Sequence, residues 1–444
     1  MTSMLESAAP SWPLPTTPVP RPRTEHAQRV GVIGLGYVGL PTALSLAESG
    51  VAVLGCDISE ERLAAIKSQQ VDLLDADRLR LAKFLGSDSD RLAITTETAS
   101  LSAVDTVLIC VPTPVDAHLV PDLTALTGAC ATVVGAARAG QTIVLTSTTY
   151  VGCTQDLLVE PLHRRGLVVG QDVYVAFSPE RIDPGVAAHA PERTPRVVGG
   201  VTAECTSRAA ETLARTAPAV HPVSSPEAAE LTKLLENTFR AVNIALANEF
   251  SGIARRFGVD ALEVVGAAAT KPYGFMPFYP GPGVGGHCIP CDPHYLLWQL
   301  KANRMASPVT EAAMASIAAR PGSVVARAQE VLAETGRALA GARILIVGVS
   351  YKPGVTDVRE SPALEIIDEL SHRGADVAFT DELVDTVRTS AGLLSSEIDP
   401  ACGDWDLVIA HTLHPGVDHG WLADTSLVLD TTYRLAHLRN RCVL

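Results

Sequence analysis

The 444-residue chain lacks any uninterrupted apolar run of about 18 residues, the length that a membrane-spanning helix requires. It is also short of positive charge, because 35 lysine and arginine residues face 49 acidic residues and leave a formal net charge of −14. A nucleic-acid-binding protein would carry a basic patch or stripe. We therefore expect neither a membrane nor a nucleic-acid partner, and an anionic substrate would need a few well-placed cations.

The nine cysteines lack the regular spacing of a disulfide framework. An odd number of scattered cysteines in a long chain indicates free thiols in a reducing compartment. Residues 1–28 hold no apolar stretch typical of a secretory signal, and the run PSWPLPTTPVPRPRT (10–24) predicts a disordered, proline-rich tail. We therefore expect a cytoplasmic protein.

Three segments follow this tail. Residues 29–215 alternate apolar strands with helical patterns, which predicts a doubly wound parallel sheet. Residues 216–338 begin with a long helical stretch from about Ser225 to Phe257, which has the length of a helix that links domains or lines a subunit interface. Residues 339–444 restart the α/β rhythm. The expected fold is α/β, with two Rossmann-like doubly wound parallel-sheet domains joined by a long central helix.

A glycine motif follows the first candidate strand, where Gly34, Gly36 and Gly39 form G-x-G-x-x-G. Such glycines allow a tight turn and let backbone N–H groups approach a pyrophosphate. Asp57 ends the next strand, where a carboxylate binds the ribose diol of NAD and repels the 2′-phosphate of NADP. An ordinary turn with a surface aspartate is the alternative, and the position in the first βα unit favours NAD. Arg62 either flanks the adenosine or is simply solvated.

Polar residues end three further candidate strands: Thr113 in CVPTP, Thr148 after Ser147, and Glu180 in SPER. Ligands of open α/β sheets bind at this carboxyl edge, so we expect an active site there. Lys233 and Asn237 are four residues apart and share one face of the long helix. Leucines flank Lys233, which favours a partly desolvated ammonium.

The stretch GGHCIPCDP places Cys288 after two glycines and four residues before Asp292. Cys288 and Cys291 form a C-x-x-C, but no second cysteine pair supports zinc and no thioredoxin-like context supports a dithiol. We interpret Cys288 as a nucleophile and Cys291 as a bystander; His287 is either a ligand, a base or structural. In the loop 348–362, Lys352 and Arg359 either clamp phosphates or form an exposed charged loop.

Taken together and in this order, GLGYVGLP, CVPTP, SPER, AELTKLLENTFR, GGHCIPCDP and SYKPGVTDVRESP resemble the UDP-glucose/GDP-mannose dehydrogenase family. The match runs from Arg29 to Leu435. The form GGHCIPxDPxYL after KPYGFMPFYPGPG is most similar to the N-acetylhexosamine branch, above all the UDP-N-acetylglucosamine 6-dehydrogenases.

The resemblance implies NAD on the first domain, a UDP-sugar on the last, and a homodimer through the central helix. It implies that Cys288 is the nucleophile, that Lys233 and Asp292 stabilise oxyanions, that Thr148 holds a water, and that Glu180 assists hydrolysis. The implied cofactor contacts are Gly34, Gly36, Val38, Gly39, Asp57, Arg62, Thr113, Thr148 and, across a domain or subunit boundary, Arg359. The implied substrate contacts are Glu180, Arg181, Lys233, Asn237, Arg240, Tyr279, Gly285 and Lys352.

The chain departs from the family pattern in three places. The family's ESTV-PGTT stretch is TSTTYVGCT here, the lysine that precedes the aspartate in the glucose branch is Cys291, and a late arginine is replaced near Thr432, which leaves Arg434 nearby. The expected reaction is an NAD-dependent four-electron oxidation of the carbon-6 alcohol of a UDP-N-acetylhexosamine through a Cys288 thiohemiacetal and thioester. The alternatives are a UDP-glucose 6-dehydrogenase, a two-electron alcohol dehydrogenase, and a non-catalytic NAD-sensing module.

Overall fold

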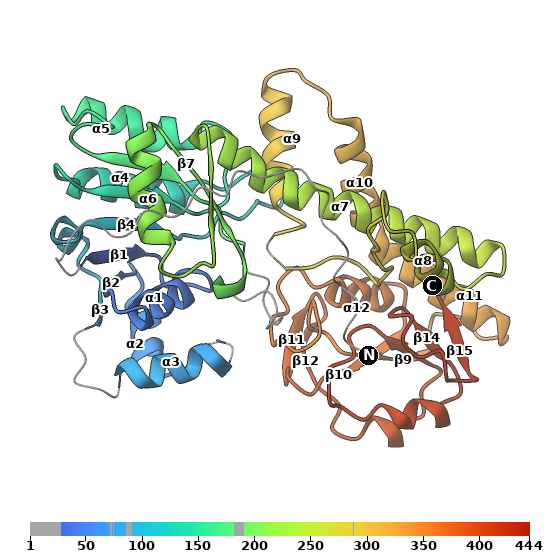
Figure 1. The fold of residues 1–444 in the computed structure, drawn as a ribbon. Helices are drawn as coiled ribbons and strands as arrows, with labels where there is room; N and C mark the ends of the chain where they lie inside the picture. Colours follow the sequence, from blue (N-terminus) through green and yellow to red (C-terminus); the bar gives the residue numbers. More distant parts are fainter. Residues whose placement is uncertain (1–27, 72, 74, 86–90, 182–190, 287) are drawn as a thin grey trace. The chain divides into compact units, whose positions relative to one another are not determined.

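The computed structural model describes residues 28–71, 73, 75–85, 91–181, 191–286 and 288–444 (Figure 1). These form two compact units. Among the described residues, the N-terminal unit contains those from 28 to 236 together with His294–Met305, and the C-terminal unit contains Asn237–Pro293 and Ala306–Leu444. The expected proline-rich tail (10–24) and the role of His287 lie outside the described residues.

An eight-stranded sheet forms the centre of the N-terminal unit. Its order is β3(Leu92–Thr95), β2(Ala52–Cys56), β1(Arg29–Ile33), β4(Thr106–Ile109), β5(Thr142–Leu145), β6(Tyr174–Phe177), β7(Arg196–Gly200) and β8(Val220–Val223). Strands β1 to β6 run parallel. Strands β4, β5 and β6 are buried at every position, as expected for strands covered by helices on both faces.

Helices cover both faces of this sheet, and each face has its own apolar cluster. One cluster receives side chains of α4(Thr124–Ala136) and α5(Glu160–Arg164), and the other those of α1(Gly39–Glu48), α2(Glu60–Lys67), α3(Asp75–Leu85) and α6(Ala203–Leu213). The strand order reverses at β1, which has β2 on one side and β4 on the other. This switch point places the first glycine turn at the edge where a doubly wound sheet binds ligands.

Strand β7 breaks the parallel pattern. It pairs antiparallel with β6, with Ala176 opposite Gly200 and Phe177 opposite Gly199, and β8 then runs parallel to β7. The apolar pattern predicts a wholly parallel sheet, and the last two strands depart from that prediction. As a result, β7 begins at the edge where β6 ends.

A second, five-stranded parallel sheet organises the C-terminal unit, with the order β10(Asp376–Thr380), β9(Arg343–Val347), β13(Leu407–Ala410), β14(Val428–Asp430) and β15(Arg441–Val443). Its helices α11(Arg320–Glu334) and α12(Pro362–His372) share one apolar cluster with the sheet. A hairpin of β11(Thr386–Thr389) and β12(Gly392–Ser395) follows β10. The expected α/β fold with two Rossmann-like sheets is confirmed.

The long helix α7(Pro226–Arg256) has 31 residues and connects the two sheets along the chain. The Ser225 hydroxyl accepts a hydrogen bond from the Ala228 N–H, and Gly258, with φ of +69°, lies just beyond the helix. The ends therefore lie within two residues of those that the sequence predicts. Helices α8(Ala261–Ala269), α9(Asp292–Ala302) and α10(Pro308–Ala318) follow. Among the described helices, none combines the length and apolar character needed to span a bilayer.

Candidate active site

The turn between β1 and α1 has the geometry of a phosphate-binding loop. Gly34 has φ of +84°, and a Cβ on Gly39 would lie 1.8 Å from the Gly34 carbonyl oxygen, so only glycine fits at both positions. Gly36 has no atom within 4 Å of an ideal Cβ. Val38 caps α1 at the same turn. The turn thus leaves open space beside the N-terminus of α1, where a pyrophosphate fits.

Asp57 and Arg62 both bind the backbone of Leu35 in this turn. Asp57 Oδ2 accepts the Leu35 N–H at 2.7 Å, and its Oδ1 accepts the Ser59 N–H at 3.0 Å. Arg62 Nε donates to the Leu35 carbonyl at 2.8 Å. The carboxylate is therefore fixed beside the glycine turn, as binding of a ribose diol requires.

The ends of β4, β5 and β6 meet at the same edge. The Ser147 hydroxyl accepts the Val111 N–H at 3.0 Å and donates to the Val111 carbonyl at 2.8 Å, which joins the ends of β5 and β4. Thr113 and Thr148 are half-buried there. The hydroxyl of Ser178 is buried without a hydrogen-bond partner among the described residues, a pattern often seen where a ligand or water completes a site.

Lys233, which is 8% exposed, lies against the turn that follows β6. Its Nζ donates to the Glu180 carbonyl at 2.9 Å, so the ammonium is buried yet hydrogen-bonded. Arg181 pairs with Glu236 of α7 and donates to the Pro195 carbonyl at 2.9 Å. The SPER turn is thereby attached to α7 through both its backbone and a side chain.

Two further groups of the N-terminal unit were not identified from the sequence. Arg196 Nη1 lies 2.7 Å from Glu180 Oε2. Glu230, which is 1% exposed, accepts the N–H groups of Gly152 at 2.6 Å and Thr154 at 2.9 Å, and burial raises the pKa of its carboxyl. Glu230 thus attaches the segment after Thr148 to the same helix that carries Lys233. A charged residue opening the apolar strand RVVGG was the available signal for Arg196.

In the C-terminal unit, the glycine-rich loop before Cys288 is anchored at several points. Asn248 Oδ1 accepts the Gly281 N–H at 2.9 Å, and Arg320 Nε donates to the Gly281 carbonyl at 2.9 Å. A Cβ on Gly285 would lie 2.5 Å from the Glu360 carbonyl oxygen and 2.7 Å from Tyr351 Cβ. The loop therefore packs directly on residues 351–360, which join β9 to α12.

Cys288 and Asp292 lie in one helical turn that opens α9. The Asp292 N–H donates to the Cys288 carbonyl at 2.9 Å, and the Asn237 side-chain amide donates to Asp292 Oδ2. Asp292 and Asn237 are 3% and 7% exposed, whereas Cys288 is exposed. Cys291 is 4% exposed. The structure thus brings together three of the predicted catalytic residues, Cys288, Asp292 and Asn237, in this unit.

The 348–362 loop supplies the predicted phosphate-binding cations. Lys352 is half-buried and follows Tyr351, whose ring lies against Gly286. Arg359 is exposed; its guanidinium pairs with Asp357 at 2.6 Å, and its carbonyl accepts the Gly286 N–H at 3.2 Å. This loop therefore neighbours the glycines that precede Cys288.

The remaining predicted substrate contacts, Arg240 and Tyr279, are exposed. Arg434, the one arginine near Thr432 in the sequence, is exposed as well, and its N–H donates to the Thr432 hydroxyl at 3.2 Å. All three side chains are therefore accessible to a ligand.

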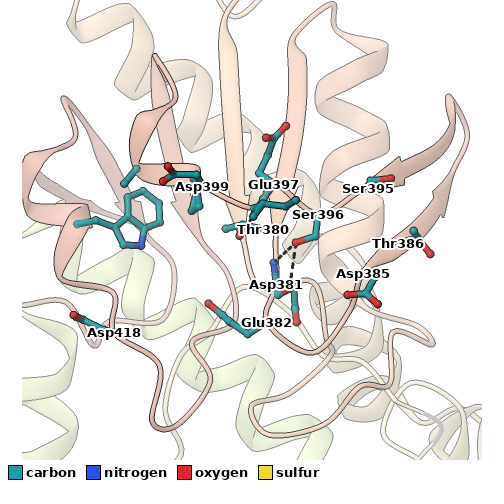
Figure 2. Close-up of a pocket in the computed structure, with 14 residues that line it drawn as sticks. Thr380, Asp381, Glu382, Asp385, Thr386, Ser395, Ser396, Glu397, Asp399 and Asp418 are labelled. Atoms are coloured by element: carbon teal, nitrogen blue, oxygen red, sulfur yellow. Dashed lines mark hydrogen bonds between the residues drawn. The ribbon is translucent and has the colours of Figure 1, made fainter.

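A cavity of about 650 Å³ in the C-terminal unit lies between β10, the hairpin and the segment near Asp418 (Figure 2). The Ser396 hydroxyl bonds to the backbone N–H and carbonyl of Asp381 in its wall. Its described lining contains no lysine or arginine and six carboxylates, those of Asp381, Glu382, Asp385, Glu397, Asp399 and Asp418. Such a wall repels a diphosphate, so this cavity is unsuited to a nucleotide.

Asp381, Glu382 and His414 bring possible metal-ligand atoms within 4.8 Å of one another. His414 Nδ1 accepts the Gly354 N–H at 3.0 Å, which places the ring proton on Nε2, 3.2 Å from Asp381 Oδ1. Asp381 Oδ2 accepts the Val349 N–H at 2.7 Å. A cation would have to displace bonds that already join β10 to the loop after β9.

Three family models match the chain in order. They describe the NAD binding domain, the central domain and the UDP binding domain of the UDP-glucose/GDP-mannose dehydrogenase family, and they match residues 28–217, 227–316 and 345–437. The chain therefore belongs to this family. It is an NAD-dependent nucleotide-sugar dehydrogenase, an oxidoreductase that acts on a CH–OH group.

Similar curated proteins carry more than one substrate name. The UDP-N-acetyl-D-glucosamine 6-dehydrogenase of Pseudomonas aeruginosa is 33% identical, over 80% of this chain and 83% of its own length. The UDP-N-acetyl-D-mannosamine dehydrogenase of Pyrococcus horikoshii is also 33% identical, over 87% of this chain and 90% of its own length.

Solved structures agree with the fold. The UDP-D-ManNAc dehydrogenase of Pyrococcus horikoshii superposes with a TM-score of 0.85 at 29% identity, covering 94% of this chain and 98% of the other. The UDP-glucose dehydrogenase of Pyrobaculum islandicum superposes with a TM-score of 0.82 at 25% identity, covering 95% and 98%.

Proposed function

We propose that the chain oxidises the carbon-6 alcohol of a UDP-N-acetylhexosamine to the carboxylate, in a four-electron reaction that reduces two NAD. The observation that carries this proposal is the helical turn of the C-terminal unit in which Cys288 precedes an Asp292 held by Asn237. A two-electron alcohol oxidation ends at the carbonyl compound and does not require a nucleophilic cysteine beside a buried carboxylate. A four-electron oxidation needs such a group to hold the aldehyde.

UDP-N-acetylglucosamine is the first choice of substrate. The motif GGHCIPCDP supports an N-acetylhexosamine, and relatives of equal identity bear the names of UDP-N-acetylglucosamine and UDP-N-acetylmannosamine dehydrogenases. UDP-N-acetylmannosamine is therefore the second choice, ahead of UDP-glucose. Lys352, beside the Cys288 loop, supplies a positive charge for the diphosphate, while the acidic cavity of Figure 2 does not.

The glycine turn and Asp57 fit NAD, which supplies the hydride acceptor when bound. Gly34, Gly36, Val38 and Gly39 would receive the pyrophosphate at the N-terminus of α1, and Asp57 would bind the ribose diol. Arg62, Thr113, Thr148 and Arg359 are the other proposed contacts.

In the first oxidation the carbon-6 hydroxyl loses its proton as hydride leaves the carbon. Asp292 is the proposed proton acceptor, through a water that Thr148 helps to hold. The amide of Asn237 orients Asp292 by donating to one of its carboxylate oxygens. Lys233 stabilises the negative charge that develops on the sugar oxygen, an effect worth about 3–4 kcal/mol for comparable donors.

In the second oxidation the thiolate of Cys288 attacks the aldehyde carbon. The thiohemiacetal that forms keeps a hydrogen on that carbon, so a second hydride can leave and a thioester remains. Positive charge favours the thiolate form of a cysteine, and the buried ammonium of Lys233 is the proposed source. Glu180 then assists a water that hydrolyses the thioester. Arg181, Arg240, Tyr279, Gly285 and Lys352 are the proposed further contacts of the UDP-sugar.

The active form is proposed to be a homodimer in the cytoplasm. Helix α7 presents exposed apolar side chains at helical spacing, among them Leu235 at 65% and Phe250 at 52% exposed. No disulfide is found among the described cysteines, which supports a reducing compartment.

Counting NADH per product with a panel of sugars tests the proposal. UDP-N-acetylglucosamine, UDP-N-acetylgalactosamine, UDP-N-acetylmannosamine, UDP-glucose and GDP-mannose should be compared, and the preferred sugar should give two NADH per acid. Cys288→Ala should yield at most one slow NADH per site while nucleotide binding persists. Cys291→Ala is the matched control and should retain most activity. Two NADH per sugar from Cys288→Ala at near-normal rate would exclude the covalent mechanism.

A further inference from the structure

Arg196 is a buried cation next to the proposed hydrolytic carboxylate. It is 3% exposed, and its Nη1 lies 2.7 Å from Glu180 Oε2, with side-chain exposures of 4% for the arginine and 12% for the glutamate. The other carboxylate oxygen, Oε1, accepts the Arg181 N–H at 2.8 Å. Both oxygens of Glu180 are therefore held, so the side chain is restrained to one orientation.

The reversed direction of β7 explains how an arginine reaches this place. Because β7 runs antiparallel to β6, its first residue lies at the edge where β6 ends and the SPER turn begins. A β7 parallel to β6 would put its first residue at the opposite edge. Burying a guanidinium is unfavourable unless it is paired, so Arg196 and Glu180 stabilise each other as an ion pair.

The same turn also carries the contact to Lys233. The Glu180 carbonyl accepts Lys233 Nζ at 2.9 Å, while its carboxylate faces Arg196. Glu180 thus binds Lys233 through its backbone carbonyl and Arg196 through its side-chain carboxylate. Glu180 cannot turn its carboxylate toward Lys233 without giving up its ion pair with the buried Arg196, which disfavours that rearrangement.

We propose that Arg196 is a positioning residue that holds the Glu180 carboxylate in the orientation needed for hydrolysis of the Cys288 thioester; this rests on the proposed function. In that step a water oxygen bonds to the thioester carbon and one water proton passes to Glu180. The carbon–sulfur bond breaks and its electron pair leaves with the thiolate of Cys288. Arg196 acts only through Glu180, and neither hydride transfer requires it.

Pre-steady-state NADH formation with the preferred UDP-sugar separates these steps. Arg196→Met should release two NADH per active site in a burst at near wild-type rate, followed by turnover slowed about a hundredfold. An acyl-enzyme on Cys288 should accumulate and be visible by mass spectrometry. Arg196→Lys keeps the charge and should show a smaller loss of steady-state rate. Arg373→Met removes an exposed ion pair with Glu369 in the C-terminal unit, which contains neither β6 nor β7, and should behave like wild type.

A double-mutant comparison shows whether Arg196 acts through Glu180. In a Glu180→Gln background, Arg196→Lys should change the steady-state rate by less than about twofold, because the partner is already lost. A folded Arg196→Lys or Arg196→Met protein in which the burst and the steady state slow together would overturn the inference. Wild type giving one NADH per product would instead contradict the proposed function and would be recognised before any variant is made.

Discussion

Asp57 accepts the N–H of Leu35 in the glycine turn and the N–H of Ser59 just before α2, so its carboxylate has a fixed direction before any ligand binds. We predict that NAD is used far better than NADP. Asp57→Ala should raise the KM for NAD about ten- to a hundredfold, since a charge-assisted hydrogen bond contributes about 1.5–3 kcal/mol, and should relax discrimination. Initial rates with both cofactors check this. Equal kcat/KM for NAD and NADP in the unmutated enzyme would contradict it.

The burial of His411 leads us to predict that the protein loses stability in mild acid. It is 3% exposed, and burial lowers the pKa of its imidazole from 6.5 to about 4. Between these values the unfolded chain binds a proton that the folded chain does not, so stability falls as the pH decreases from 6.5 to 4. The full loss is roughly 3 kcal/mol.

Thermal unfolding between pH 7 and pH 4 checks the role of His411. His411→Asn retains a polar group near the Thr412 hydroxyl and should flatten this part of the Tm profile. The exposed His372→Asn serves as the control and should leave the profile unchanged. Identical slopes for His411→Asn and wild type would refute the assignment.

Sequence motifs identify functional residues that lie a few positions apart. The structure adds contacts between residues that are far apart in the sequence. Lys233 and Asn237, or Cys288 and Asp292, lie four residues apart, so their relation follows from helix geometry. Glu230 contacts Thr154, 76 residues away, and Arg320 contacts Gly281, 39 residues away. A single sequence does not show which distant residues are in contact, because these contacts depend on how the helices and strands pack.

At the scale of elements, apolar runs predict most strands but not their direction. The runs at 142–145 and 174–177 are found because each is buried throughout and bounded by turn residues. Strand β7 has a similar apolar run, yet nothing in RVVGG distinguishes a parallel from an antiparallel neighbour. Strands β3, β7, β8, β11, β12 and β15 are not among the strands that the apolar runs predict.

The loop before Cys288 offers a test of element packing. Gly285→Ala places a Cβ 2.5 Å from the Glu360 carbonyl oxygen, so the loop must shift away from residues 351–360. We predict a loss of about 1–3 kcal/mol in the free energy of unfolding and a marked fall in kcat. Gly281→Ala meets no atom within 4 Å and should be neutral in both measurements. Equal stability and kcat for the two variants would show that this packing does not matter.

At the scale of the whole molecule, the exposed apolar face of α7 predicts self-association. Leu235, Phe239, Leu246, Phe250 and Ile253 are each at least 40% exposed. Phe250→Glu should convert a dimer to a monomer in sedimentation or light-scattering measurements, because a charge at the centre of an apolar interface is left unpaired. Leu393→Glu, at a 63% exposed position of the β11–β12 hairpin, is the control. A monomeric wild type, or a dimeric Phe250→Glu, would argue against this interface.

The close packing of the Cys288 loop also limits how the substrate range can be altered by directed evolution. Side chains cannot be introduced at Gly283 or Gly285 without displacing Pro362 or the Glu360 backbone, so libraries built there would consist mainly of unstable variants. Met276 and Tyr279, on the same loop, are 62% and 58% exposed and can be replaced without disturbing the packed glycines. Diversity placed at these two positions would leave the packing of the Cys288 loop intact, and Tyr279 is one of the proposed substrate contacts.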